Sequence, residues 1–568
     1  MTNQKKKLLV IAGAAALVLL IVIIILVRVC TPSKSRMKLE DYFEAKKGQA
    51  VLILQDEISE ETALYEDGHI YVDIELIQSK FNSRFYWDAK QNILIYTTPS
   101  KVIKAEVGKK EYTENKSVND VNYQIVKVIE ENVYVALDYV EEFSDISYEV
   151  YEEPVRAVIT YKWNKDYLYA KAKKDTALRY EANIKSDILT DLKKEEKLLL
   201  LDTSKKVEGG FVKAMTESGV IGYVKKKKIT DGEYETLKSD FKKEKYSHIS
   251  LGEKVNLVWH QVTNQDANES LLNLLDSTKG VNVVAPTWFA VEGNKGVISS
   301  LASEAYVERA HNANVQVWAL CNDFSEDVNM NKLLSTTSSR EKLEKELIAA
   351  AIKYNIDGIN IDFENITSEA GPHFVQFIRE LSIKCRNNEI VLSIDNYPPT
   401  EYTAYYNRKE QGEVADYVIT MAYDEHYATS KESGSVASIG FVEDAVNNTI
   451  EQVDPSRVII ALPFYTRLWK EADENGETVI KSHDSYSMTS AANLLTDYEA
   501  EAEWDDETQQ YYAEWKEGDL TCRIWMEEEE SLDAKLKVAE AGKVAGYAFW
   551  KLGLEKAAVW DTIVKYTN

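Results

Sequence analysis

The stretch Asp357–Glu364 combines the periodicity of a strand with closely spaced acids. Apolar and polar residues alternate, so one face carries an amide and two carboxylates, those of Asn360, Asp362 and Glu364. An unpaired buried carboxylate is costly, so this face must meet water, a ligand or an ion. Two neighbouring acids repel, and one of them tends to keep its proton near neutral pH, as a general acid must. A solvated edge strand explains these eight residues equally well.

The flanking segments argue against an edge strand. A helix-like segment, 340–354, precedes the acidic stretch, and another, 371–386, follows it. The order is helix, strand, helix, with the acids at the carboxyl end of the strand. In an α/β barrel that end carries the active site.

Apolar strand-like runs recur between helix-like segments from Leu251 onward. The eight runs are 255–259, 281–286, 315–320, 356–364, 390–394, 416–421, 458–463 and 545–550. Eight strands in about 300 residues predict an α/β fold of the (β/α)8 TIM-barrel type. A doubly wound open sheet is the alternative, but it should show a glycine-rich phosphate turn after its first strand, where this chain has Trp259-His260-Gln261.

Polar and aromatic residues follow most of these strands, and nine of the eleven tryptophans lie after residue 250. Aromatic planes stack on pyranose rings, while amides and carboxylates take the sugar hydroxyls. This recurrence predicts a site for a sugar polymer at one barrel mouth. The substrate-binding candidates are Asn360, Asp424, Trp550, Trp288, Asn396, Tyr465 and Arg467.

The acidic motif is similar to one in a known enzyme family. The pattern Asp357-x-x-Asn360-x-Asp362-x-Glu364 resembles the fourth-strand motif of family 18 glycoside hydrolases, the chitinase family. Met421-Ala422-Tyr423-Asp424 resembles the sixth-strand motif, and Trp550 falls where the eighth strand supplies a sugar-platform tryptophan. Four further stretches resemble the spore-germination and cortex-lytic N-acetylglucosaminidase branch: 286–289, 423–426, 463–469 and 549–555.

The resemblance implies a role for each catalytic candidate. In this family the N-acetyl group of the substrate is the nucleophile, so one protein acid suffices at the leaving oxygen. Glu364 would be that acid and then the base on water. Asp362 would hold the acetamido N–H and stabilise the oxazolinium intermediate, and Tyr423 would hydrogen-bond the same acetamido group. Asp424 would contact the bound sugar and Trp550 would form its floor.

Asn360 departs from the family pattern, which usually has Asp at this position. An amide cannot share a proton with Asp362, so we expect a smaller charge-driven rise in the pKa of Asp362 and a shifted pH optimum. The same substitution occurs in the cortex-lytic branch, so activity is still expected. A structural role is expected for Asp357, with any further role left open.

The N-terminus predicts a membrane anchor. Leu8–Val27 contains twenty uncharged residues, enough for a helix to span about 30 Å of hydrocarbon. Lys5, Lys6 and Lys7 precede it, which favours a cytoplasmic N-terminus and extracytoplasmic C-terminal domains. The run ends Val27-Arg28-Val29-Cys30, which suits neither a cleaved signal peptide nor a lipid-modified cysteine. We expect a single-pass protein of a bacterial cell membrane, of Gram-positive type.

Composition excludes several classes of function. The formal net charge of −27 argues against nucleic acid as a partner, because phosphate contacts need Lys and Arg. The four cysteines are far apart and do not form a disulfide framework. The seven histidines show no pair at metal-ligand spacing, so we expect no metal and no cofactor.

The region between the anchor and the barrel predicts two small modules. The pattern of 70–77, an aromatic strand and a further strand recurs from 133–140, and this α+β repeat resembles the stalk-like N-terminal domain of copper amine oxidases, without copper ligands. Gly210–Ala214, a polar turn and Gly219–Val224 predict a hairpin and resemble a bacterial SH3-type barrel. That module either attaches to cell wall or is a plain spacer.

The expected organisation is therefore an anchor, two modules, a linker and a barrel. The boundaries are 1–36 for the cytoplasmic tip and anchor, 37–163 for the stalk, 164–230 for the SH3-like module, 231–250 for the linker and 251–568 for the barrel, with an insertion at about 470–526. The insertion supplies either a wall of the sugar groove or a hydrophobic minicore. Anchoring favours peptidoglycan as substrate; a chitinase and a non-catalytic glycan-binding barrel are the alternatives.

Overall fold

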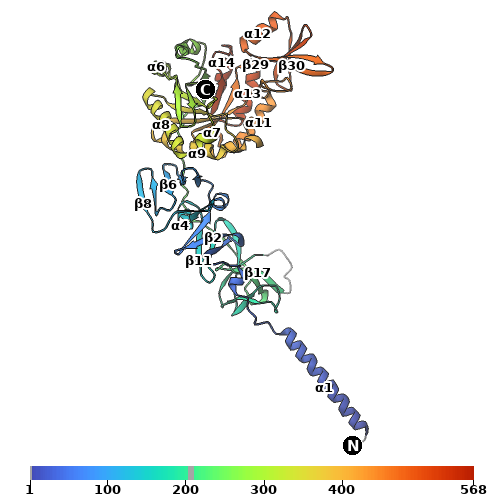
Figure 1. Cartoon of the computed structure of the whole chain (residues 1–568). Helices are drawn as coiled ribbons and strands as arrows, with labels where there is room; N and C mark the ends of the chain where they lie inside the picture. The colour runs from blue at the N-terminus through green and yellow to red at the C-terminus, as the bar shows by residue number, and fades with distance from the viewer. Residues whose placement is uncertain (1–2, 202–209, 568) are drawn as a thin grey trace. The chain divides into compact units, whose positions relative to one another are not determined.

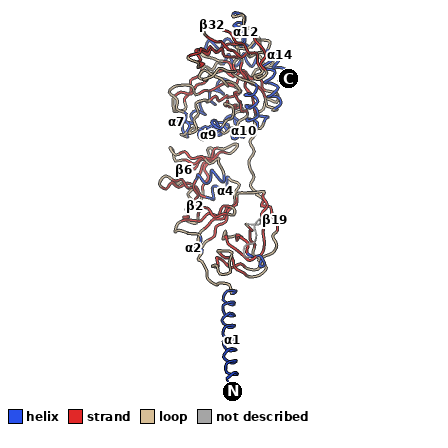
Figure 2. Tube along the Cα trace, turned by 90° about the vertical axis from the view of Figure 1, so that its right-hand side faces the viewer, coloured by secondary structure: helices blue, strands red, loops and turns tan. Residues whose placement is uncertain are grey.

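The computed structural model describes residues 3–201 and 210–567 of the chain. The chain forms two compact units (Figure 1). The first comprises Met1–Phe85 and Lys104–Lys243, and the second comprises Tyr86–Ile103 and Glu244–Asn568. Strands dominate the globular part of the first unit, whereas helices and strands alternate along the second (Figure 2).

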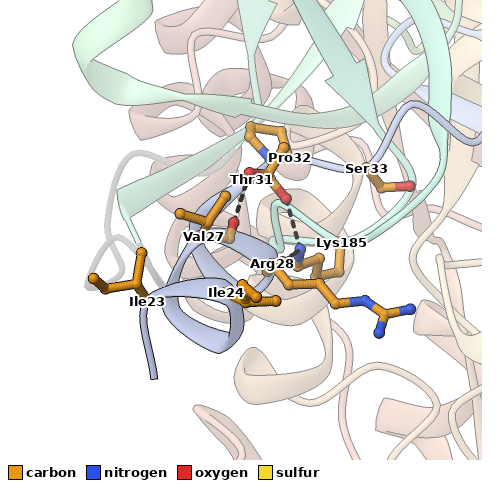
Figure 3. A pocket seen from close by; sticks show the side chains of 8 residues that line it. All are labelled: Ile23, Ile24, Val27, Arg28, Thr31, Pro32, Ser33 and Lys185. Atoms are coloured by element: carbon orange, nitrogen blue, oxygen red, sulfur yellow. Dashed lines mark hydrogen bonds between the residues drawn. The ribbon is translucent and has the colours of Figure 1, made fainter. Parts of the chain in front are cut away.

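The first unit begins with helix α1, Asn3–Cys30, which extends beyond the predicted apolar run at both ends. None of its described residues is buried, and the helix is long and apolar enough to cross a membrane. Lys185 lies beside its C-terminal end, where the ammonium group donates hydrogen bonds to the carbonyl oxygens of Arg28 and Thr31 (Figure 3). These bonds satisfy carbonyls that the end of a helix leaves without partners.

The α+β repeat is present in the structure. Each copy runs from a strand into a short helix and on to two further strands, as β3-α3-β4-β5 and β10-α4-β11-β12. Seven strands of this region form one sheet in the order β11-β12-β1-β2-β3-β10-β9. The elements are α2 (Leu39–Tyr42), β1 (Gln49–Leu54), β2 (Glu57–Glu66), β3 (His69–Asp73), α3 (Ile74–Leu76), β4 (Tyr86–Asp88), β5 (Ile93–Thr97), β6 (Val102–Glu106), β7 (Glu111–Glu114), β8 (Ser117–Asp120), β9 (Val126–Ile129), β10 (Asn132–Ala136), α4 (Leu137–Phe143), β11 (Ser147–Tyr151) and β12 (Arg156–Thr160).

A second seven-stranded sheet, entirely antiparallel in its pairings, contains the hairpin expected of the SH3-like module. Strands β17 and β18 form that hairpin, but the SH3-like identity stays a prediction. Strand β19 lies inside the expected linker. Its residues are nearly all exposed, so the sequence shows no apolar periodicity that would predict a strand there. The strands are β13 (Lys165–Lys171), β14 (Thr176–Arg179), β15 (Ile188–Leu192), β16 (Lys197–Leu200), β17 (Phe211–Thr216), β18 (Ile221–Lys225) and β19 (Glu233–Leu237).

These two sheets share one hydrophobic core. Val51 and Ile53 of β1 belong to the same buried cluster as Leu178, Leu198 and Val224 of the second sheet. The two modules that the sequence separates at residue 163 are therefore packed into a single unit.

The second unit is a closed barrel of eight parallel strands, as predicted. The strands follow one another around the barrel as β20-β34-β28-β27-β26-β25-β24-β21, and β21 pairs with β20 to close it. All eight predicted runs coincide with these strands to within three residues at their first positions. The strands are β20 (Val255–His260), β21 (Val283–Pro286), β24 (Gln316–Asn322), β25 (Gly358–Asp362), β26 (Val391–Asn396), β27 (Tyr417–Met421), β28 (Val458–Pro463) and β34 (Gly546–Trp550).

Helices surround the barrel, and a short hairpin, β22 (Phe289–Glu292) and β23 (Val297–Ser300), follows its second strand. Both predicted helices beside the acidic strand are present as α8 and α9. Asn355 ends α8 in a left-handed conformation with φ of 56°, one that Asn tolerates better than most residues. The helices are α5 (Leu271–Leu275), α6 (Glu304–Asn312), α7 (Met330–Leu334), α8 (Thr337–Tyr354), α9 (Gly371–Asn387), α10 (Arg408–Val414), α11 (Ile439–Ile450), α13 (Glu529–Ala541) and α14 (Val559–Thr567).

Side-chain alternation divides the barrel core into two layers. Inward-facing residues such as Trp259, Trp318 and Ile419 fill the barrel interior. Outward-facing residues such as Ile359 and Ile361 pack against the surrounding helices. The sequence's two-residue period on β25 therefore reports which side chains point into the barrel.

The insertion between the seventh and eighth strands forms a five-stranded sheet with one helix. Its small core contains Leu468, Cys522 and Ile524, with Tyr511 and Trp515 packed against it, which agrees with the minicore interpretation. The expected hairpin near residue 514 is β32–β33. The elements are β29 (Tyr465–Glu474), β30 (Glu477–Ser487), α12 (Met488–Asp497), β31 (Ala502–Asp505), β32 (Gln510–Glu517) and β33 (Leu520–Trp525).

The β4–β5 hairpin belongs to the second unit, although the sequence assigns it to the stalk. Asp88 Oδ2 accepts hydrogen bonds from the backbone N–H of Thr337, at 2.6 Å, and from its hydroxyl. The Gln91 side chain accepts from the N–H of Ser338 at 2.8 Å. These are orphan donors of the first turn of α8, whose own N-cap residue, Thr336, provides no side-chain bond. The hairpin therefore caps a barrel helix.

The same hairpin also helps to satisfy a fully buried arginine. Arg340 forms a bidentate ion pair with Glu380, at 2.9 and 3.1 Å. Its remaining fork donates to the Tyr86 hydroxyl of β4, at 3.2 Å, and to the carbonyl of Leu334, at 2.7 Å. A buried guanidinium needs this full set of acceptors, so residues 86–103 complete the folded barrel unit.

Replacing Asp88 by Ala should lower the stability of the barrel unit by about 2 kcal/mol, because a helix cap and charge-assisted hydrogen bonds are lost together. The measurement is denaturant unfolding followed by tryptophan fluorescence, which reports mainly on the region after residue 250. The control is Asp120→Ala, an exposed carboxylate of β8. Equal midpoints for the two variants would contradict the capping role.

Candidate active site

Strand β25 carries the acidic motif to the carboxyl end of the barrel. Asn360 and Asp362 share the inward face of this strand, and Glu364 lies two residues beyond, past the strand's last residue. Glu364 is half-buried, whereas Asp362 is only 7% exposed and Asn360 is fully buried. The motif thus runs from the barrel core to its rim.

Asp362 is a buried carboxyl group surrounded by other acids. Its Oδ1 atom is buried and has no hydrogen-bond partner among the described residues. Burial raises the pKa of Asp362 well above its ordinary value, and the charges of Asp395, Glu364 and Asp323 raise it further. A protonated Asp362 is therefore favoured in the empty site.

Glu364 is held from two directions. The Tyr397 hydroxyl donates to its Oε2 atom at 2.5 Å. The Asp323 carboxylate accepts from the backbone N–H of Glu364 and of Asn365, both at 3.0 Å, and so fixes the chain where it leaves the strand. Burial raises the pKa of Glu364, and the Tyr397 hydrogen bond lowers it in part. A raised pKa suits a carboxyl group that must deliver a proton near neutral pH.

The Asn360 side chain is enclosed and cannot contact a bound sugar. Its Oδ1 accepts from Trp259 Nε1 at 3.0 Å, and its Nδ2 donates to Ser393 Oγ at 3.0 Å and to Asp395 Oδ1 at 2.8 Å. Its role is to connect three barrel strands. The sequence predicts a smaller rise in the pKa of Asp362 because Asn360 is uncharged. In the structure Asp395, on the neighbouring strand, supplies a charge that raises this pKa instead.

Tyr423 and Asp424 lie just past the end of β27, as the motif predicts. Tyr423 is half-buried, and burial raises the pKa of its hydroxyl well above the ordinary value. Asp424 is exposed, has a φ of 58° and accepts a hydrogen bond from the Tyr465 hydroxyl. Arg467 lies nearby on β29, where its guanidinium donates to the carbonyl of His483 at 2.7 Å. These four residues meet at the same end of the barrel as Glu364.

Trp550 also lies at this end and is accessible there, whereas two other candidates near the carboxyl ends of strands, Trp288 and Asn396, are buried. Trp550 ends β34, is partly exposed and packs against Trp259 with 6.0 Å between ring centroids. Trp288 and Asn396 are 2% and 1% exposed, respectively. Trp288 donates to Asn268, and Asn396 bonds Gln411 of α10. Asn396 has the parity of β26 that faces the helices, which its sequence position after a strand did not reveal.

Three polar residues of the site were not among the sequence candidates: Asp323, Asp395 and Tyr397. Each lies at or just past the carboxyl end of a barrel strand, β24 or β26, which was the available signal. Sequence spacing alone could not tell which of these side chains converge on Glu364. The alternation of β26 points Asp395, rather than Asn396, into the barrel.

Asp357 has the expected structural role. Its Oδ2 accepts from the backbone N–H of Val317 and contacts the His311 ring, each at 2.8 Å. These contacts tie β25 to β24 at the amino end of the barrel, opposite the catalytic end. Residues at that end of a barrel typically contribute to stability rather than to catalysis.

Comparison with known proteins identifies the family. The model of glycosyl hydrolases family 18 matches residues 257–555. The chain belongs to glycosyl hydrolase family 18. It is therefore a glycosidase with a (β/α)8 barrel. The model of the copper amine oxidase N-terminal domain matches residues 54–188, which covers most of the predicted stalk and extends into the expected SH3-like module.

Several named proteins are similar to the family 18 part of this chain. The uncharacterized glycosylase YvbX of Bacillus subtilis is 24% identical over 301 residues, 51% of this chain and 85% of that protein. The cortical fragment-lytic enzyme of Bacillus cereus is 22% identical over 250 residues, 43% of this chain and 57% of that protein.

Two solved structures share the fold. The C-terminal domain of a putative chitinase from Desulfitobacterium hafniense aligns over 56% of this chain and 100% of its own, with a TM-score of 0.51 and 21% identity. The spore cortex-lytic enzyme SleL of Bacillus cereus aligns over 60% of this chain and 78% of its own, with a TM-score of 0.50 and 19% identity.

Replacing Tyr397 by Phe should raise the pKa of Glu364, because the hydrogen bond that favours its ionised form is lost. The family resemblance implies that Glu364 is the proton donor of the first step, so the alkaline limb of kcat/KM is expected to move up by about one pH unit. The measurement is the pH profile on chitin oligosaccharides. Tyr402→Phe, at an 88% exposed tyrosine of the same loop, is the control. A downward shift, or an equal one in both variants, would contradict the assignment.

Proposed function

We propose that this protein is a membrane-anchored, extracytoplasmic β-N-acetylglucosaminidase that cleaves β-1,4 bonds in the glycan strands of peptidoglycan. It acts with retention of configuration and uses the acetamido group of the substrate as nucleophile.

One observation supports this mechanism above the others. Of the two acids at the carboxyl end of the β25 motif, Glu364 is partly exposed at the barrel rim, whereas Asp362 is 7% exposed. A protein nucleophile must reach the anomeric carbon, and a carboxylate buried in the barrel wall cannot. Asp362 is instead suited to receive an N–H from a group of the substrate that points into the barrel.

In the first step Glu364 donates its proton to the glycosidic oxygen as the bond to the leaving sugar breaks. The acetamido oxygen attacks the anomeric carbon, and the resulting oxazolinium ion carries a positive charge. Asp362, in its ionised form, accepts the acetamido N–H and stabilises that charge. Tyr423 hydrogen-bonds the same acetamido group, and Trp550 supports the sugar ring from below.

In the second step Glu364, now ionised, takes a proton from water. The water oxygen attacks the anomeric carbon on the face that the leaving group vacated and opens the oxazolinium ring. Asp424, with Tyr465 and Arg467 beside it, supplies polar contacts to the sugar hydroxyls. The net result is hydrolysis with retention, and Glu364 regains its proton.

The substrate class and location rest on three further features. Relatives of the barrel include proteins named cortical fragment-lytic enzymes and a sporulation-specific glycosylase. Helix α1 has the length and composition of a membrane anchor, and Lys5–Lys7 before it favour a cytoplasmic N-terminus. A barrel held in this way outside the membrane would meet the polymer of N-acetylated hexosamines in the cell wall.

Replacing Glu364 by Gln in the full chain, purified in detergent, should lower the rate on peptidoglycan by about 10²- to 10⁴-fold, because the proton donor is removed. The measurement is mass spectrometry of released reducing ends, from purified peptidoglycan and separately from chitin oligomers. The matched control is Glu369→Gln, an exposed glutamate five residues further along the chain.

Muropeptides ending in N-acetylglucosamine, released by the parent and by Glu369→Gln but not by Glu364→Gln, are the expected result. Products from chitin oligomers alone would replace peptidoglycan by chitin as substrate. Binding of glycan without products from any of the three proteins would overturn the enzymatic proposal in favour of a glycan-binding barrel.

A further inference from the structure

Two buried carboxyl groups, Asp362 and Asp395, project into the barrel from the neighbouring strands β25 and β26, close to Glu364. The register of β25 and β26 pairs Asn360 with Ser393 and Ile361 with Ile394. Continued by one residue, the same register sets Asp362 beside Asp395. Both side chains face the barrel interior, because Asn360 on the same face bonds Asp395 Oδ1 directly.

We propose that Asp395 is the second carboxyl group of a proton-sharing pair with Asp362, a part that Asn360 cannot play. Asp395 acts through Asp362 and is a positioning residue. This inference rests on the proposed function for its place in the reaction, while the pair itself is a property of the folded barrel.

The orientation of Asn360 is fixed by its partners. The indole N–H of Trp259 can only donate, so the atom that it contacts must be the amide oxygen of Asn360. The amide nitrogen therefore faces Ser393 and Asp395. Burial raises the pKa of Asp395, and the amide N–H donated by Asn360 lowers it in part. Asp362 Oδ1 has no such partner among the described residues, so the ionised form is favoured at Asp395 over Asp362, and Asn360 itself has no proton to exchange.

The burial of the Asp362 and Asp395 carboxyl groups favours the presence of one proton on the pair. Asp362 and Asp395 are 7% and 3% exposed, and two ionised carboxylates so placed would repel each other in a poorly solvated interior. Asp362 Oδ1 is buried without a partner among the described residues. A single proton shared between the two groups removes the repulsion.

Among the described residues, the titratable groups that face Asp362 are acids, phenols and the buried Cys321 thiol of β24, whose pKa burial raises. Asp323 approaches from the end of β24, Glu364 from its own strand, Asp395 from β26, Tyr423 from the end of β27 and Tyr397 from the segment after β26. The proton that Asp362 gives up when it becomes ionised must therefore go to another acid.

The exchange conserves protons. In the empty site Asp362 holds the proton and Asp395, bonded by Asn360, is ionised. When the acetamido N–H of the substrate binds Asp362, the O–H bond of Asp362 breaks and an O–H bond of Asp395 forms. Asp362 is then the carboxylate that the oxazolinium ion requires, and the net charge of the pair is unchanged. The proton returns to Asp362 when product leaves.

The first test compares Asp395→Asn with the double variant Asn360→Asp/Asp395→Asn, in the full chain purified in detergent. In Asp395→Asn the neighbouring negative charge is lost, so Asp362 should ionise at lower pH and the acidic limb of the pH profile of kcat should move down by about one pH unit. The double variant restores a carboxyl group on the other side of the amide contact and should return that limb toward its parental position.

An acidic limb that stays shifted in the double variant, while both proteins keep parental thermal unfolding, would overturn the pair. So would an unchanged pH profile of kcat in Asp395→Asn. A purely structural role of Asp395 would lower the unfolding temperature and leave the pH profile of the remaining activity unchanged.

The second test needs no substrate and so separates this inference from the proposed function. Infrared spectra of the parent and of Asp395→Asn are recorded across neutral and acidic pH and subtracted. With Asp395 neutral, Asp362 loses the neighbouring charge that raises its pKa, so the carbonyl band of its protonated form should disappear at lower pH than in the parent. A difference spectrum without such a shift would refute the pair, even if the protein cleaves glycan as proposed.

Discussion

The structure of the site depends on one constraint, the burial of carboxyl groups in the wall of a closed barrel. Asp362 and Asp395 occupy buried, inward-facing positions near the carboxyl ends of β25 and β26, one layer above Asn360 and Ser393. An isolated charge at such positions would cost several kcal/mol, so the neighbouring side chains must supply hydrogen bonds to it. Asn360 accepts a hydrogen bond from Trp259 and donates to Ser393 and Asp395, which forms a polar layer beside the two acids. This polar layer separates the apolar core below from the sugar-facing residues above.

Glu364 owes its character to its position one layer higher. The chain leaves β25 between Asp362 and Glu364, and Asp323 fixes that exit by accepting two backbone N–H groups. Glu364 is therefore close enough to the buried acids to feel their charge and exposed enough to reach a substrate. One strand thus places a structural amide, a buried acid and an accessible acid at successive depths.

Buried polar groups on the outside of the barrel also need hydrogen-bond partners. The β4–β5 hairpin supplies hydrogen-bond acceptors to two sets of donors on α8. Asp88 accepts from the first turn of the helix, and Tyr86 accepts from Arg340, which is also paired with Glu380. A segment that the sequence assigns to the stalk is thereby part of the catalytic unit. Residues 86–103 have short, locally ordinary strands, and nothing in their pattern indicates that Asp88 meets a helix almost 250 positions away.

Much of the fold could be predicted from the sequence, because a barrel strand buried on both faces leaves a clear apolar run. The eight strands, the helices on both sides of β25 and the β32–β33 hairpin follow from such local signals. The motifs that contain Glu364, Tyr423 and Trp550 each end a predicted strand, so the sequence alone predicts that these side chains lie at the same end of the barrel.

What was missed depends on contacts between strands. Asn396 and Asp395 both lie at the end of the same apolar run, so the sequence does not distinguish them. The alternation of the strand decides that Asp395 faces inward. Trp288 was chosen for its position after a strand, yet the chain turns there and buries the ring. Strand β19 was read as linker because an exposed edge strand needs no apolar face.

The central claim is that the acetamido group of the substrate, rather than a protein carboxylate, attacks the anomeric carbon. The most direct test is the cleavage rate of a series of aryl glycosides of the chitin disaccharide in which the acetamido methyl group carries no, one, two or three fluorine atoms. Fluorine withdraws electrons from the attacking oxygen, so the account predicts a rate that falls steadily along the series. A rate independent of fluorination would contradict it and would assign the attack to a residue of the protein.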